Sequence, residues 1–84
     1  MKLAQLSYVA AIAEQGSLRA AARHLGVAQP AFSRSIAALE RELGAPLFER
    51  RARGMIATPL GEAFVRRANA ILNMGHTGAA FATG

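Results

Sequence analysis

The stretch VAQPAFSRSIAALEREL, residues 27–43, decides the fold of this chain. At helical spacing its large apolar residues fall on one side, and they are Phe32, Ile36, Leu39 and Leu43. The opposite side carries Gln29, Pro30, Ser33, Arg34 and Arg41. Proline suits the first turn of a helix, where its missing N–H costs nothing, and Gly44 suits its end. The stretch therefore predicts a short helix with its apolar side in a core and its N-terminal polar side offered to a polar partner.

Composition limits the kind of protein that this can be. The chain has 84 residues, enough for one small domain, and its lack of Cys excludes a disulfide framework. The net charge is +5, the difference between ten basic residues and five Glu. Nine of the ten basic residues are Arg, a bias that suits bidentate contacts with phosphates and base edges. No stretch is long and apolar enough to span a bilayer, and the N-terminus does not resemble a signal peptide. We expect a cytoplasmic protein that does not bind membranes.

Two helices are expected before the central stretch. The first is amphipathic and ends at Gly16, with apolar positions at Leu3, Leu6, Val9, Ile12 and Ala13. Ser17 caps a second helix that runs to about Leu25, with Leu18, Ala21, Ala22 and Leu25 directed inward. A tight turn at Gly26 leads into the central helix, which is the pattern of a helix-turn-helix. Ala28 occupies the N-cap position there and should weaken the helix start by roughly 1 kcal/mol relative to Ser.

The period of the sequence changes after Gly44. Residues 46–50 and 55–57 are predicted to be short strands, and residues 51–54 the turn of a hairpin with arginines at its tip. Thr58 and Pro59 open a last helix that we expect to reach about Ala80. Its apolar stripe consists of Leu60, Phe64, Ala68, Ile71 and Gly75. We expect residues near Leu60 and Phe64 to join the core and the later ones to pair with a second copy.

These residues resemble a known family, the N-terminal DNA-binding domains of LysR-type transcriptional regulators. The similarity is almost gapless from Leu3 to about Leu72. It is carried by GSL at 16–18 with AA at 21–22, VAQPAFSR at 27–34, Ile36 with ALE at 38–40, ELG at 42–44, PLFER at 46–50, and TP at 58–59 followed by GE at 61–62. The resemblance implies a mainly α fold, a winged helix-turn-helix over residues 1–58, and a linker helix over residues 59–84 that pairs two chains. A small-molecule inducer is expected only on an effector-binding domain absent from this sequence.

The chain departs from the family pattern at a few positions. Ala28 stands where Ser is usual, which removes a hydroxyl beside the expected DNA backbone. Leu18 replaces a larger residue, and Gly75 and Gly78 are unusual in a linker helix. Both glycines fall in the far part of the expected dimer contact.

Candidate contacts with double-stranded DNA follow from residue type and position. We expect base contacts from Gln29, Pro30, Ser33 and Arg34. Backbone or minor-groove contacts are expected from Ser17, Arg19, Arg50, Arg51 and Arg53, with Arg50 alternatively pairing with a carboxylate of the body. The expected homodimer interface consists of Phe64, Ala68, Ile71, Leu72 and Gly75. Each residue also has a simpler interpretation as a cap, a solvated charge or a core residue.

Other functions remain as alternatives to a dimeric domain that binds an interrupted palindrome. A winged helix can serve as a protein-interaction module, and molybdate-responsive regulators have a DNA-binding domain of similar fold. An enzyme is not expected, because the chain has no Asp or Cys and its five Glu are scattered among arginines. His24 and His76 are isolated, so we expect neither a metal nor a cofactor.

Overall fold

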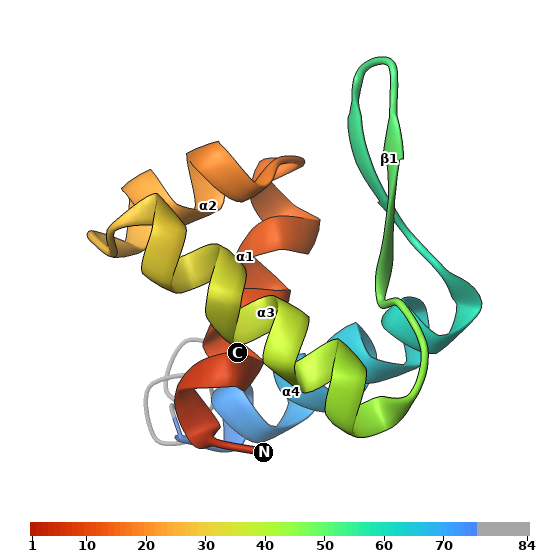
Figure 1. The fold of residues 1–84 in the computed structure, drawn as a ribbon. Helices are drawn as coiled ribbons and strands as arrows, with labels where there is room; N and C mark the ends of the chain where they lie inside the picture. Colours follow the sequence, from red (N-terminus) through yellow and green to blue (C-terminus); the bar gives the residue numbers. More distant parts are fainter. Residues whose placement is uncertain (76–84) are drawn as a thin grey trace.

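The computed structural model describes residues 1–75, which form four helices and a two-stranded antiparallel hairpin (Figure 1). In chain order the elements are α1 (Leu3–Gln15), α2 (Leu18–Leu25), α3 (Gln29–Leu43), β1 (Phe48–Arg51), β2 (Gly54–Ala57) and α4 (Pro59–Gly75). Helices α2 and α3 form the helix-turn-helix, and the hairpin projects beside them as a wing. The predicted mainly α, winged helix-turn-helix fold is confirmed.

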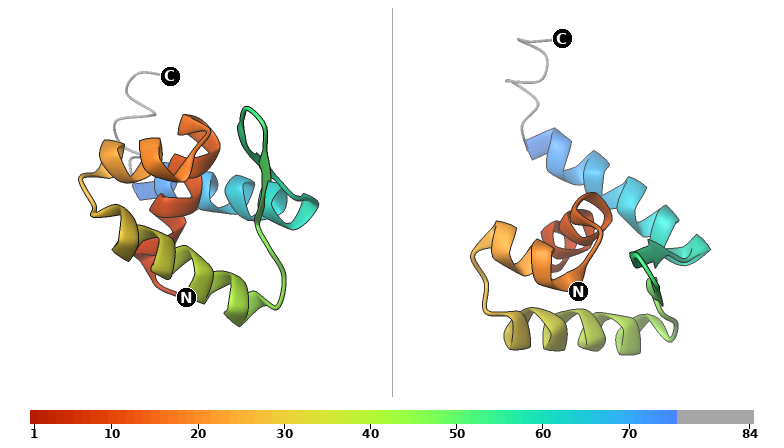
Figure 2. Two further views of the ribbon diagram at one scale, coloured as in Figure 1. Left: turned by 45° about the horizontal axis from the view of Figure 1, so that its top comes forward. Right: turned by 90° about the horizontal axis from the view of Figure 1, so that it is seen from above.

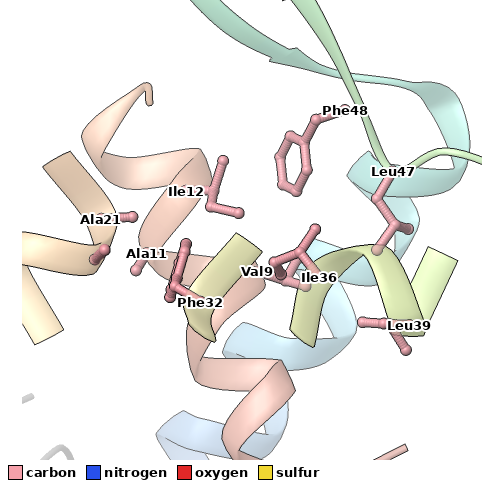
Figure 3. Packing of buried hydrophobic residues seen from close by; sticks show 10 residues of the cluster. Val9, Ala11, Ile12, Ala21, Phe32, Ile36, Leu39, Leu47 and Phe48 are labelled. Carbon is pink, nitrogen blue, oxygen red and sulfur yellow. The ribbon is translucent and has the colours of Figure 1, made fainter. Parts of the chain in front are cut away.

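Helix α1 is the centre of the packing. It contacts α2 and α3 on one side and α4 on another, as the view from above in Figure 2 shows. The largest fully buried side chains are Val9, Ile12, Phe32, Leu39 and Leu47, and they meet in one cluster (Figure 3). The Tyr8 ring lies beside that of Phe32, with ring centroids 4.6 Å apart. The core therefore fixes α3 from behind and leaves its outer side free.

The helix boundaries follow from local signals. The Ser17 hydroxyl accepts a hydrogen bond from the backbone N–H of Ala20 at 3.0 Å, and Thr58 Oγ1 accepts one from the N–H of Gly61 at 3.0 Å. Both predicted caps are therefore confirmed. Ala28 occupies the N-cap position of α3 and supplies no side-chain hydrogen bond, as expected. The predicted helix ends at Gly16 and Gly44 are also confirmed.

Three expected core positions on α1 and α3 are wrong. Leu3 is 67% exposed and Leu43 is 39% exposed, because they lie at the first residue of α1 and the last residue of α3, beyond the other helices. Ala13 is exposed because its short side chain lines only a shallow hollow with Ala57 and Val65. The buried side of α1 instead includes Gln5, which no apolar pattern could predict.

The hairpin exists, but its strands are shifted relative to the prediction. The pairing of Arg51 with Gly54 leaves only Ala52 and Arg53 in the turn. Residues 46 and 47 precede β1 because the N–H of Leu47 donates to Glu40 Oε2 at 2.6 Å instead of to a strand, and the Leu47 side chain is buried in the core.

Helix α4 packs along α1 and divides its apolar stripe between two environments. Ala68 is 0% exposed within this chain, so its assignment to a dimer interface is corrected to the core. Leu60, expected in the core, is 39% exposed because it lies on the edge of the apolar arc away from α1. The predicted extension to Ala80, with His76 and Gly78, lies outside the described residues. No helix within residues 1–75 is long and apolar enough to cross a membrane.

Candidate nucleic-acid interface

The outer side of α3 is the first part of the candidate interface. Gln29, Pro30 and Arg34 are exposed there, and Ser33 is half-buried. Phe32, Ile36 and Leu39 are buried on the opposite side, so the helix cannot rotate to hide its polar residues. The structure thus presents an amide, a hydroxyl and a guanidinium along the first two turns of a rigid helix, groups that can bond base edges in a major groove.

A hollow of about 390 Å³, here called the wing hollow, lies between the helix-turn-helix and the hairpin. Three separate elements contribute its polar lining, namely Ser17 and Arg19 from α2 and its cap, Gln29 from α3, and Arg50 and Arg51 from the wing. Five of the nine predicted DNA contacts therefore meet in one concave surface. Pro30, Ser33, Arg34 and Arg53 do not line it.

The wing is held against the helices by its backbone. The N–H of Met55 donates to the carbonyl O of Gly16 at 2.9 Å. Gly54 has φ 128°, and a Cβ on it would lie 2.6 Å from the same carbonyl O. Only glycine suits this position, because the backbone angle and the close approach both exclude a side chain. The arginines of the wing are consequently held in a defined place beside α2.

The charges around the wing hollow are mostly positive and accessible. Arg19, Arg50, Arg51 and Arg53 are all exposed. Arg51 Nη2 lies 3.0 Å from Glu49 Oε2, and both side chains are more than half exposed, so this ion pair contributes little to stability. The alternative pairing expected for Arg50 is absent among residues 1–75, where Arg51 has the carboxylate partner instead. A phosphate could replace Glu49 at little cost.

Two residues that position the wing were not predicted as functional. Glu40 on α3 accepts the N–H of Leu47 and so anchors the segment that enters β1. Gly61 on α4 lies so close to Leu47 that a Cβ would overlap its carbonyl O. Both lie within the stretches that carry the family resemblance, which was the available signal, but their contacts join segments distant in the sequence.

Residues 3–62 match the sequence profile of bacterial regulatory helix-turn-helix proteins of the lysR family. This region is more than half of the chain. The chain belongs to the LysR family. A curated relative from Cupriavidus pinatubonensis (strain JMP 134 / LMG 1197), the HTH-type transcriptional regulator TfdS, is 49% identical over 77 residues, which cover 92% of this chain and 26% of the relative. This LysR-family chain thus spans about a quarter of the length of that relative.

Solved structures of LysR-family proteins have the same architecture. The CbnR DNA-binding domain in its DNA complex is 40% identical, with a TM-score of 0.82 over 99% of this chain and 95% of that one. The BenM DNA-binding domain in a complex with benA site 1 DNA is 37% identical, with a TM-score of 0.85 over 99% and 96% of the two chains. The comparisons do not favour a protein-interaction module or a molybdate-responsive regulator.

Proposed function

We propose that this LysR-family chain binds double-stranded DNA sequence-specifically as part of a bacterial transcription regulator. The observation that carries the proposal is the wing hollow beside α3, where cationic and polar groups from three elements converge next to the exposed residues of the first turns. The DNA complexes of the similar CbnR and BenM domains support it. The function is binding rather than chemistry, and it would operate in the cytoplasm, where bacterial DNA lies.

In this proposal α3 enters the major groove. Gln29 and Arg34 bond base edges, Ser33 adds a hydroxyl, and Pro30 makes van der Waals contact. Ser17 and Arg19 bind the backbone at the start of α2, where N–H groups and the helix dipole favour a phosphate. Arg50, Arg51 and Arg53 bind phosphates or enter the adjacent minor groove.

We further propose that two copies pair through α4. Ile71 is 40% exposed, and Leu60, at 39%, lies on the same edge of the helix. Phe64 is half-buried and borders this edge, whereas Leu72 is half-buried on the far side of Ala68, where it lines a hollow with residues of α1 and α2. Gly75 ends the described helix. A symmetric pair would present two α3 helices about one helical turn of DNA or a multiple apart, which matches an interrupted palindrome.

The test is selection of duplex DNA from a random pool at physiological salt, with wild type, Arg34→Ala and the matched control Arg66→Ala in parallel. Arg66 lies on α4 and lines neither the wing hollow nor the outer side of α3. Enrichment of an interrupted palindrome by wild type and the control, relaxed in Arg34→Ala, would support the proposal. If the chain enriches no motif even when a fused coiled coil enforces dimerisation, the proposal is wrong.

A further inference from the structure

A second hollow lies on the other flank of α3, away from the wing. It has a volume of about 460 Å³ and is formed where the start of α1 meets the middle of α3. Its polar lining consists of Lys2 and Gln5 from the start of α1 and Arg34, Ser35 and Glu42 from α3. The N-terminus and the tip of the wing lie at opposite ends of the molecule (Figure 1). Helix α3 thus has a polar hollow on each side.

A buried glutamine fixes the geometry of this second hollow. Gln5 is 8% exposed and uses both ends of its amide. Its Nε2 donates to the carbonyl O of Ser35 at 3.1 Å and to Ser35 Oγ at 3.4 Å, and its Oε1 accepts the backbone N–H of Lys2 at 2.8 Å. A satisfied buried amide of this kind specifies one arrangement of the groups that it joins. The backbone of Lys2 is therefore held in a defined place beside α3, with its side chain exposed.

The hollow carries net positive charge. Lys2 and Arg34 are exposed cations, and neither makes an ion pair within residues 1–75. The carboxylate of Glu42 lies 3.0 Å from the terminal ammonium of Met1, which offsets its charge. An anion entering the hollow would meet two uncompensated cations.

We propose that Lys2 binds a phosphate of the DNA strand opposite the one that the wing contacts, and that Gln5 is its positioning residue. A major groove is bordered by a phosphate backbone on each side, so cations on both flanks of a helix lying in it can each bind a phosphate. The wing hollow supplies the arginines of one flank, and Lys2 supplies the other. This inference rests on the proposed DNA binding, and it assigns Lys2 a role in affinity and register but not in base recognition.

The test is the salt dependence of duplex binding by Lys2→Gln, with Lys2→Arg and Arg66→Gln as matched controls. Each lost phosphate contact should reduce the slope of log K against log salt by about 0.9 per chain. We expect this reduction in Lys2→Gln only, with an unchanged preference for the selected sequence over unrelated duplex. An unchanged slope in Lys2→Gln, with wild type still binding steeply, would overturn the inference and leave the proposed function intact. Failure of wild type to bind any duplex would instead overturn the proposed function.

A double-variant cycle tests the positioning role. Gln5→Met keeps the volume and the charge of the side chain but removes its hydrogen bonds to Lys2 and Ser35, here called the tether. It should therefore reduce the salt slope as Lys2→Gln does. The double variant should show no further reduction. Ser35→Ala removes only the 3.4 Å contact and gives a milder form of the same test. Thermal unfolding of each variant checks that the fold is retained. Additive reductions would show that Lys2 acts without the tether, and the positioning role of Gln5 would then be wrong.

Discussion

Helices α3 and α4 have similar apolar stripes in the sequence but different surroundings in the structure. The stripe of α3 is buried along most of its length, and the exposed side of this helix is polar. The stripe of α4 is wider than the surface that covers it: Ala68 is buried, whereas Leu60 and Ile71 are exposed on one edge. At 100° per residue these two residues lie within about 20° of each other and about 60–80° from Ala68.

This difference separates two kinds of binding surface. An exposed polar side on a helix whose other side is fixed in the core can bond groups on DNA without losing stability. An exposed apolar edge gains free energy only when another apolar surface covers it. We therefore propose different partners for the two helices, a nucleic acid for α3 and a second copy of the chain for α4. Four substitutions test this comparison.

The largest effect is expected from Phe32→Ala. Phe32 is fully buried, so its loss removes the contact that fixes α3 against α1 and leaves a cavity. We expect a loss of about 3–5 kcal/mol in the free energy of unfolding, measured by chemical denaturation. Because only the folded chain binds DNA, binding should fall in proportion to the folded fraction. It should recover at DNA concentrations high enough to stabilise the folded state. A loss under about 1 kcal/mol would mean that α3 is not held by its apolar side.

The next effect is expected from Ile71→Glu. Burying a charge in an apolar dimer contact and losing the isoleucine from both copies should weaken the dimer by about 2–4 kcal/mol. Light scattering over a concentration series measures this shift toward monomer. Asn69→Glu, at an exposed position about 160° around the same helix from Ile71, is the control for added negative charge. An unchanged mass for Ile71→Glu would place the dimer contact elsewhere.

Arg34→Ala should act on the ligand surface of α3 and not on the fold. We expect about 1–3 kcal/mol weaker binding to the selected duplex. The free energy of unfolding should be nearly unchanged, because the Arg34 side chain is exposed. Titration against the selected and an unrelated duplex measures the loss. An equal loss on both would reassign Arg34 from base to phosphate contact, and no loss on either would remove it from the interface.

The smallest effect is expected from Ala28→Ser, which concerns how α3 begins. Ala28 is exposed, has φ −61° and ψ 130°, and supplies no cap to the helix. A serine hydroxyl can accept a free N–H of the first turn, so stability should rise by about 1 kcal/mol. Thermal unfolding measures this rise, and a lower melting temperature would show that serine does not fit the N-cap position.

Much of the fold could be predicted because its signals are local. The caps at Ser17 and Thr58 and the glycine after α1 each involve residues within one helical turn of each other. The DNA-binding candidates on α3 could be identified for the same reason, since helical spacing alone separates Gln29 and Arg34 from Phe32. Whether these candidates contact DNA remains a prediction.

Other features could not be predicted, because they depend on segments far apart in the sequence. The spacing of apolar residues on α4 did not show which of them α1 would cover. In the structure Ala68 is buried and Ile71 is exposed. Gln5 is a polar residue, so its place in the chain gave no reason to expect burial. In the structure it is buried because its Nε2 donates to the carbonyl O of Ser35, thirty residues away. The position of the wing arginines depends on the hydrogen bond that the N–H of Met55 donates to the carbonyl O of Gly16.

The sequence by itself determined the order of the helices, the ends of the first three, the presence of a hairpin and the polar character of the outer side of α3. These follow from backbone preferences and periodicity, which act over a few residues. Only the tertiary structure decided which apolar residues are covered, where the wing lies, and that α3 has a cationic hollow on each flank. Burial and long-range hydrogen bonds are properties of two segments together, so neither segment alone encodes them.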